Sequence, residues 1–483
     1  MNITREYLQA VTRRHFLRQC QVGLGGMALA ALLGNDAVGE IAGLKPLADR
    51  PPQLPTRAKH VIFLHLAGGP SQLEMFDPKP ELAKRHGQDC PEELLKGQRF
   101  AFIKGVPKLL GPVFSFRQHG QSGAWLSSLL PHLASCADDL TIVRSMTTEQ
   151  FNHAPAQLLM HTGSQLLGHA SMGAWASYGL GTLNQDLPGF VVLCSGGHSP
   201  DAGKSVWGSG YLPGVFQGVQ CRSVGDPILY LDNPPGMSGE VRRRSLDAIA
   251  DLNAMQAAEF GSPETLARIE QYELAYRMQA SAPKVMDIGR ESPAMLAAYG
   301  AQPGQASFAN NCLLARRLVE QGVRFVQLYD WGWDSHGTAP SNDLLHHLPK
   351  KCQEMDRPVA ALISDLKSRG LLDETLIILG GEFGRTSMME ARGGSTHLGR
   401  DHHPKAFSMV FAGGGLKPGA TYGETDDFSY FVTKDEMTVR DLQATILHLL
   451  GLDAHKLTFP HTGLDQRLIG PEGNARVHHE LIL

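Results

Sequence analysis

Short runs of apolar residues alternate with amphipathic segments along most of this chain. A run that is apolar on both faces is typical of a buried strand in a parallel sheet, because helices cover such a sheet on both sides. Runs of this kind occupy residues 61–66, 140–143, 324–329, 375–379 and 406–412. Between two of them, residues 356–370 carry apolar side chains at helical spacing and end at a glycine. The alternation predicts an α/β fold whose mainly parallel sheet is flanked by helices.

The segment from about residue 200 to residue 305 departs from this alternation. It opens with many Gly and Pro residues and then carries two long helical patterns, at residues 246–260 and 262–282. We interpret the segment as a helical insertion on the sheet rather than as a separate catalytic domain.

The N-terminus has the pattern of an export signal. Two adjacent arginines, Arg13 and Arg14, precede an apolar, Gly-rich stretch at residues 22–34. That stretch is too short to cross a bilayer core of roughly 30 Å as an ordinary helix, and the paired arginines resemble the twin-arginine signal. We therefore expect a signal peptide over residues 1–39, a linker over residues 40–59 and export to the periplasm. An amphipathic first helix of the fold is the alternative.

Composition narrows the class of protein. The 483 residues are 42% hydrophobic and 19% charged, with a formal net charge of −4. This balance offers no broad basic face for nucleic acid, and no apolar run after the leader is long enough to anchor the mature chain in a membrane. The seven cysteines lack paired zinc spacing, so a thiolate metal site is not expected. The composition indicates no particular oligomeric state.

Three polar clusters lie beside predicted strands in the second half of the chain. They are Asp330–Gly337, Gly380–Thr386 and Gly399–Pro404. Open α/β sheets bind ligands just beyond the carboxyl ends of their strands. Carboxylate and imidazole together form the ligand set of zinc, manganese and iron sites. We therefore expect the three clusters to form one shared site.

Several segments resemble the alkaline phosphatase/sulfatase superfamily. Residues 368–384 are similar to a helix–strand segment of that superfamily, and residues 406–419 to the strand and turn that follow it. Residues 438–452 resemble its closing helix, and residues 153–163 resemble the helix that carries its nucleophile. The resemblance implies an alkaline-phosphatase-like domain with a helical insertion.

Four signatures narrow the resemblance to an uncharacterised, twin-arginine-exported bacterial branch of the superfamily. They are Gly68-Gly-Pro-Ser-Gln72, Trp333-Asp-Ser-His336, Gly381-Glu-Phe-Gly-Arg-Thr386 and Gly399-Arg-Asp-His-His-Pro404. The resemblance covers residues 60–195 and 305–455, so we expect the domain over residues 60–455 and a C-terminal tail over residues 456–483.

The resemblance implies a metal site that is only partly retained. Asp334 and His336 occupy the place of two ligands to the superfamily's first metal, and His402 or His403 occupies the place of a third. For the second metal the resemblance implies three ligands, of which only Glu382 remains. We therefore expect one divalent ion, which could be zinc, manganese or calcium. Glu382 would be either a fourth ligand or a hydrogen-bond acceptor that contacts a ligand and not the ion.

Asp401 is a further carboxylate beside this expected site. Three other residues are candidates for catalysis. His153 stands where the superfamily has its hydroxyl or thiol nucleophile, and imidazole suits a nucleophile or an acid–base group. Arg385 could bind sulfate or phosphate oxygens, and Ser71 offers a hydroxyl.

Each of these candidates also has a structural interpretation. Ser71 could cap a helix, His153 could be a packing or hydrogen-bonding residue, and Arg385 could pair with Glu382 or Asp401. The tryptophans at 331 and 333 could stack on a sugar ring or wall the pocket.

The sequence thus favours an exported, metal-dependent hydrolase of sulfate or phosphate esters. Its substrate would be a small molecule or a carbohydrate ester rather than nucleic acid. A protein of the same fold that binds a metal or an anion without turnover is the alternative, since the superfamily's nucleophile and second metal site are not retained.

Changing Arg13 and Arg14 together to lysine should leave the protein in the cytoplasm, because the export receptor reads the paired guanidinium groups and not charge alone. Fractionation of cells that express each variant measures this. Unchanged export of the double variant would contradict the signal assignment.

Overall fold

A computed structural model of the protein describes residues 46–483, apart from residues 99, 101, 104, 230, 235, 261 and 262. The expected signal peptide and the first residues of the expected linker lie outside the described part of the chain. Within that part, none of the helices combines the length and the apolar character of a membrane span.

A nine-stranded sheet forms the centre of the fold. Eight strands follow one another across it in the order β12 (Ala420–Tyr422), β4 (Leu140–Thr147), β11 (Phe407–Ala412), β8 (Thr375–Gly380), β1 (His60–Ala67), β7 (Phe325–Trp331), β5 (Phe190–Ser195) and β6 (Val219–Gln220). The ninth, β15 (Met437–Thr438), pairs with β4. All five apolar runs of the sequence are therefore strands of this sheet.

The sheet is parallel except at β11, which runs antiparallel to both β4 and β8. The connection from β8 to β11 has no α-helix, only a short 3₁₀ turn (Arg392–Gly394) and the strands β9 (Gly384–Arg385) and β10 (His402–His403). Parallel neighbours need a crossover, usually a helix, whereas a strand that turns back without one pairs antiparallel. The mainly parallel α/β sheet expected from the sequence is confirmed.

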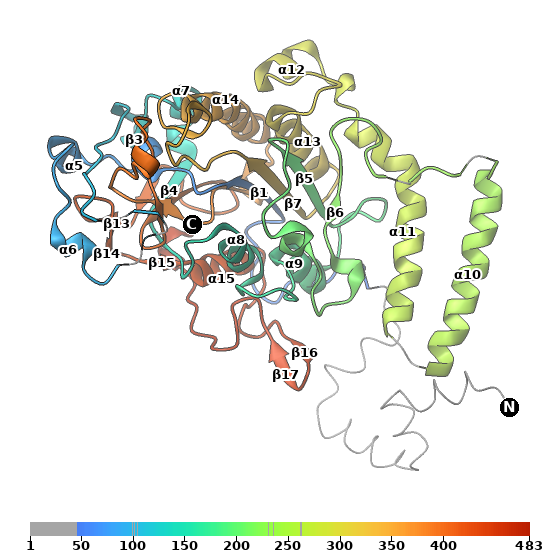
Figure 1. Cartoon of the computed structure of the whole chain (residues 1–483). Helices are drawn as coiled ribbons and strands as arrows, with labels where there is room; N and C mark the ends of the chain where they lie inside the picture. The colour runs from blue at the N-terminus through green and yellow to red at the C-terminus, as the bar shows by residue number, and fades with distance from the viewer. Residues whose placement is uncertain are drawn as a thin grey trace.

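Helices cover both faces of the sheet (Figure 1). On one side lie α7 (Pro131–Ala134), α12 (Pro293–Tyr299), α13 (Phe308–Glu320) and α14 (His347–Ser368). On the other lie α8 (His153–Thr162), α9 (Met172–Leu180) and α15 (Val439–Leu449). The helix expected at residues 356–370 is the second half of α14, which begins earlier, at His347, and contains Pro358 in its interior.

The two helical patterns of the expected insertion form a hairpin, α10 (Gly239–Phe260) and α11 (Pro263–Met286), that projects from the body of the protein (Figure 1). Residues 219–220, which fall inside the range expected for the insertion, belong instead to the central sheet as β6. Smaller elements complete the fold: α4 (Gln72–Met75), α5 (Pro80–Lys84), α6 (Glu92–Leu95), β2 (Phe116–His119), β3 (Ala124–Ser127), β13 (Glu424–Thr425), β14 (Val432–Lys434), β16 (Phe459–His461) and β17 (Leu464–Gln466).

Strand β1 decides where a site can form. Every residue of it is buried, and it pairs in parallel with β7 on one side and β8 on the other. Because Ala67 is level with Trp331, and His65 with Gly380, the three strands end at one edge of the sheet. The loops that follow them therefore meet at that edge.

Candidate metal centre

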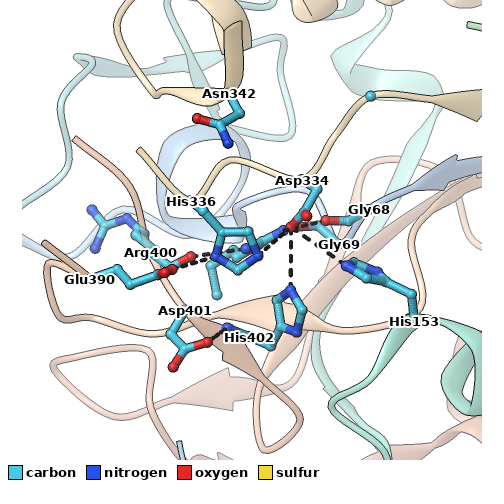
Figure 2. Close-up of polar contacts among 12 residues, drawn as sticks. Gly68, Gly69, His153, Asp334, His336, Asn342, Glu390, Arg400, Asp401 and His402 are labelled. Carbon is cyan, nitrogen blue, oxygen red and sulfur yellow. Dashed lines mark hydrogen bonds and ion pairs between the residues drawn. The ribbon is translucent and has the colours of Figure 1, made fainter. Parts of the chain in front are cut away.

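Four side chains from three segments meet beyond this edge of the sheet (Figure 2). Asp334 and His336 follow β7, His402 lies in β10, and His153 is the first residue of α8. One ligand atom from each lies within 4.8 Å of the ligand atoms of the other three. The structure thus brings together parts of two of the three polar clusters and adds His153 to them.

All three imidazoles point the same nitrogen at one oxygen. The Nε2 atoms of His336, His402 and His153 lie 2.9, 3.3 and 3.5 Å from Oδ1 of Asp334. Two ligands bound to a tetrahedral ion at the usual 2.0–2.1 Å are separated by about 3.3 Å. The three separations from Oδ1 lie around that value, and all four ligand atoms lie within 4.8 Å of one another, a spacing compatible with one small divalent ion.

The other nitrogen of each ring, Nδ1, is hydrogen-bonded to an oxygen outside the centre. Nδ1 of His336 is bonded to the carboxylate of Glu390. Nδ1 of His402 is 2.7 Å from the carbonyl oxygen of Phe151, and Nδ1 of His153 is 2.6 Å from Oε1 of Glu382. A carbonyl or a carboxylate can only accept, so each Nδ1 carries the proton and each Nε2 is directed at the centre.

This arrangement is the usual one for histidines that bind metal, whose second ring nitrogen donates to a carboxylate or a carbonyl oxygen. In addition, Nε2 of His153 is buried and has no hydrogen-bond partner among the described residues. A divalent ion at the centre would satisfy it. The residues present therefore fit the metal that the sequence leads us to expect.

The charged groups of the centre shift one another's pKa values. Burial acts to raise the pKa of Asp334, but Arg385 and the three imidazoles hold that pKa far below its usual range. Burial disfavours the charged form of His153, yet its ion pair with Asp334 and its hydrogen bond to Glu382 outweigh burial and raise its pKa to about 9. An ion that binds Nε2 of His153 would therefore displace a proton from it. Burial and the charge of Arg385 lower the pKa of His402 to about 4. The carboxylate of Asp334 is therefore the fixed charge around which the imidazoles gather.

Arg385 pairs with Asp334, and not with Glu382 or Asp401 as the sequence suggested. Its guanidinium also donates to the carbonyl oxygens of Gly68, Gly69 and Arg400, and only 1% of its surface is exposed. In this structure the guanidinium of Arg385 thus holds two loops and the carboxylate of Asp334 together, and its expected role in binding a substrate anion stays a prediction.

Gly68 and Gly69 lie directly after β1, at the edge of the sheet where the candidate centre forms. Their φ angles are +123° and +63°. A Cβ atom on Gly68 would lie 2.5 Å from the backbone nitrogen of Asp334, and one on Gly69 would lie 2.6 Å from the ring of Phe383. Both the conformation and the close approach require glycine here.

Glu382 lies behind the centre rather than in it. It is fully buried, its Oε1 bonds His153, and its Oε2 faces Nε2 of His65 at 3.3 Å. The backbone N–H of Gly68 also donates to Oε1, at 3.1 Å. Of the two roles considered for Glu382, the geometry matches that of an acceptor that orients a ligand.

Two of the expected ligands point elsewhere. Oδ2 of Asp401 accepts from the backbone N–H groups of Phe102 and Ile103, at 2.8 and 3.2 Å. Nε2 of His403 is 2.6 Å from the carbonyl oxygen of Tyr430. Adjacent residues of a strand face opposite ways, so His402 and His403 cannot both reach the centre.

Ser71 does not have the helix-cap role considered for it, whereas Trp333 matches one of the two roles considered for the tryptophans. Ser71 precedes α4 but makes no side-chain cap, and its buried hydroxyl has no partner among the described residues. Trp333 is only 1% exposed and donates from Nε1 to Asp330, so it walls the site and is not free to stack on a sugar. Trp331 is half-buried, and the centroid of its ring lies 5.9 Å from the centroid of the His198 ring.

Sequence reasoning missed the two groups that hold His336 and His402. Glu390 lies in an irregular loop with no motif, and Phe151 contributes a backbone carbonyl, which no side-chain pattern reveals.

Fold and site together define an α/β protein with a three-histidine, one-carboxylate candidate metal centre at the carboxyl edge of its sheet. The chain belongs to the family described as a protein of unknown function, DUF1501, whose sequence profile matches residues 58–482. Among curated proteins, none matches the chain.

Solved structures similar to the chain include sulfatases, hydrolases and phosphatases. One is the PsFucS1 sulfatase from Pseudoalteromonas sp., with 14% identity, TM-score 0.36, and coverage of 82% of this chain and 68% of that one. Another is a phosphonate monoester hydrolase from Silicibacter pomeroyi, with 12% identity, TM-score 0.32, and coverage of 87% and 76%. A third is a protein in the alkaline phosphatase superfamily from Vibrio parahaemolyticus, with 11% identity, TM-score 0.33, and coverage of 90% and 74%.

Gly68→Ala should both destabilise the protein and weaken its metal binding, because the added Cβ would push on the backbone of Asp334. We expect the free energy of unfolding to fall by about 1–3 kcal/mol from backbone strain, and by more from the contact. Gly87→Ala is the matched control, since Gly87 also has a positive φ but open space around it. Urea unfolding and metal analysis compare the two, and equal effects would contradict the close-approach argument.

His402→Ala should abolish stoichiometric metal, whereas His403→Ala should leave it in place, because only the first ring faces Asp334. Elemental analysis of the folded, desalted variants measures this. Loss of metal from both variants, or from neither, would overturn the ligand assignment.

Proposed function

We propose that this protein is a metal-dependent hydrolase of sulfate or phosphate esters. The observation that carries the proposal is the convergence of three oriented imidazoles on one carboxylate oxygen, at the edge of the sheet where α/β enzymes bind their substrates. The similarity of the chain to sulfatases and phosphatases, with its family motifs, gives the choice of ester.

One ion, of zinc or manganese type, suits the centre better than two. Three nitrogen donors favour such ions over calcium, which takes oxygen ligands. A second ion nearby would need further anionic ligands, but Gly68 and Gly69 provide none and Arg385 adds a positive charge. Glu382 is already committed to His153 and His65.

When bound, the ion would supply Lewis-acid polarisation of an ester oxygen and offset the negative charge that develops there. The chain's own residues would orient the ligands and maintain the charge of Asp334. Glu382 and Glu390 hold two imidazoles in their orientation, and Arg385 keeps Asp334 ionised and the glycine loop in place. These groups are buried, so water is excluded from the back of the site.

The attacking group we propose is water. In the described part of the chain, no hydroxyl or thiol side chain is hydrogen-bonded or ion-paired to the four residues of the centre. His153 stands at the nucleophile's position, but Glu382 occupies its Nδ1 and its Nε2 faces Asp334. It serves better as a ligand than as a nucleophile.

A second candidate is a protein on the same fold that binds a metal or an anion without turnover. One observation favours it: Arg385 donates to three carbonyl oxygens and to Asp334, so four of its five N–H groups are already engaged within the protein. In either case we propose export to the periplasm through the twin-arginine pathway, which carries proteins after they have folded.

Purified protein should hydrolyse aryl sulfate or aryl phosphate esters when zinc or manganese is added. Glu390→Gln should lower kcat/KM by about 10–100-fold, the usual effect of removing a carboxylate behind a metal-binding histidine. His403→Ala should keep most of the activity, since its ring faces away. Background rates for the wild type with every metal and both ester classes would refute the hydrolase and leave the binding protein.

A further inference from the structure

A second group of side chains of the kinds that can ligate a metal lies on two loops and shares no residue with the candidate centre. It consists of Asp343, His346 and His397, each with one ligand atom within 4.8 Å of the others. Asp343 lies just before α14, and His397 lies in the connection that leads to β10.

One oxygen of Asp343 already has a structural role. The carboxylate is fully buried, and its Oδ1 accepts from the backbone N–H groups of His346 and His347, at 2.7 and 3.1 Å. These are free N–H groups at the beginning of α14, so this oxygen acts as a helix cap. The cap leaves the other oxygen, Oδ2, available.

Two imidazoles from different segments face that second oxygen. Nδ1 of His346 lies 2.6 Å from Oδ2 of Asp343, and Nδ1 of His397 lies 3.5 Å from it. A separation of 3.5 Å is too long for a good hydrogen bond. It is close to the separation of about 3.3 Å between two ligands of a tetrahedral ion.

The pair formed by His346 and Asp343 is closer than two ligands of one ion and would need only a small movement to hold one. Nδ1 of His346 is at hydrogen-bond distance and would move outward by less than 1 Å to reach the same ligand spacing. Its side chain is 63% exposed, and that of His397 is 34% exposed, so solvent can fill the remaining coordination positions.

We propose that Asp343, His346 and His397 bind a second divalent transition ion of zinc type, apart from the centre. Two imidazoles and one carboxylate favour such an ion over calcium or magnesium. Because the site has three protein ligands and is open to solvent, it should bind the ion more weakly than the buried centre.

The position of this site gives the ion a structural role. The segments that carry Asp343 and His397 run side by side, with the N–H of Leu344 bonded to the carbonyl oxygen of Leu398 at 2.9 Å. The same two segments lead to His336 and to His402 of the centre. An ion at the second site would tie them together without contacting a substrate.

The test is titration of the desalted full-length protein with Zn²⁺, followed by calorimetry and thermal unfolding. The wild type should bind one further Zn²⁺ per chain and unfold at a higher temperature as it does so. His397→Ala and Asp343→Asn should each lose this event by at least tenfold in affinity. Asp343→Asn keeps the helix cap, so it separates metal binding from folding. His455→Ala, which removes an exposed histidine elsewhere, is the matched control.

His336→Ala separates this site from the centre, because it should remove the tightly held ion and leave the added one. No further Zn²⁺ binding by the wild type would overturn the proposal and reduce the group to a hydrogen-bonded cap. Equal binding by His397→Ala and the wild type would overturn it as well. Neither result depends on whether the centre catalyses hydrolysis.

Discussion

The attraction between one carboxylate oxygen of Asp334 and four cationic or polar partners is the interaction on which the rest of the site depends. Three imidazoles and the guanidinium of Arg385 are directed at it from four separate segments. A mostly buried carboxylate is costly unless it is paired, and a buried imidazole is costly unless both nitrogens find partners. Asp334 is paired in this way, and of the side-chain nitrogens in the four residues of the centre only Nε2 of His153 is buried without a hydrogen-bond partner in the described part of the chain, so an ion there would complete the arrangement.

The fold holds these segments together through strand β1 and the glycines that follow it. Because β1 lies between β7 and β8, the loops after all three strands come within reach of one another. Gly68 and Gly69 then pass so close to Asp334 and Phe383 that no side chain fits between them. Arg385 donates to the carbonyl oxygens of both glycines and pairs with Asp334, so it ties the glycine loop to the candidate centre.

The sequence predicted the sheet well, because buried parallel strands are continuous apolar runs and little else in a soluble protein looks like them. It also predicted that Asp334, His336 and a histidine at 402 or 403 would meet, since strand ends share one edge. It could not decide whether His402 or His403 reaches Asp334, because that depends on which side chains of β10 point toward the centre. It did not find Glu390 or the carbonyl of Phe151, and it gave Arg385 an open role, because long-range hydrogen bonds leave no local pattern. The start of α14 was also missed, because the helix begins at His347, ahead of the residues 356–370 whose apolar spacing predicted it.

X-ray absorption at the metal edge of the purified, desalted protein tests the centre most directly, since it reports the atoms around a bound ion without reference to any reaction. The expected spectrum shows only nitrogen and oxygen neighbours at about 2.0–2.1 Å for zinc, together with outer-shell scattering from three imidazole rings. A sulfur neighbour, or a bound ion without imidazole scattering, would contradict a centre built from Asp334, His336, His402 and His153.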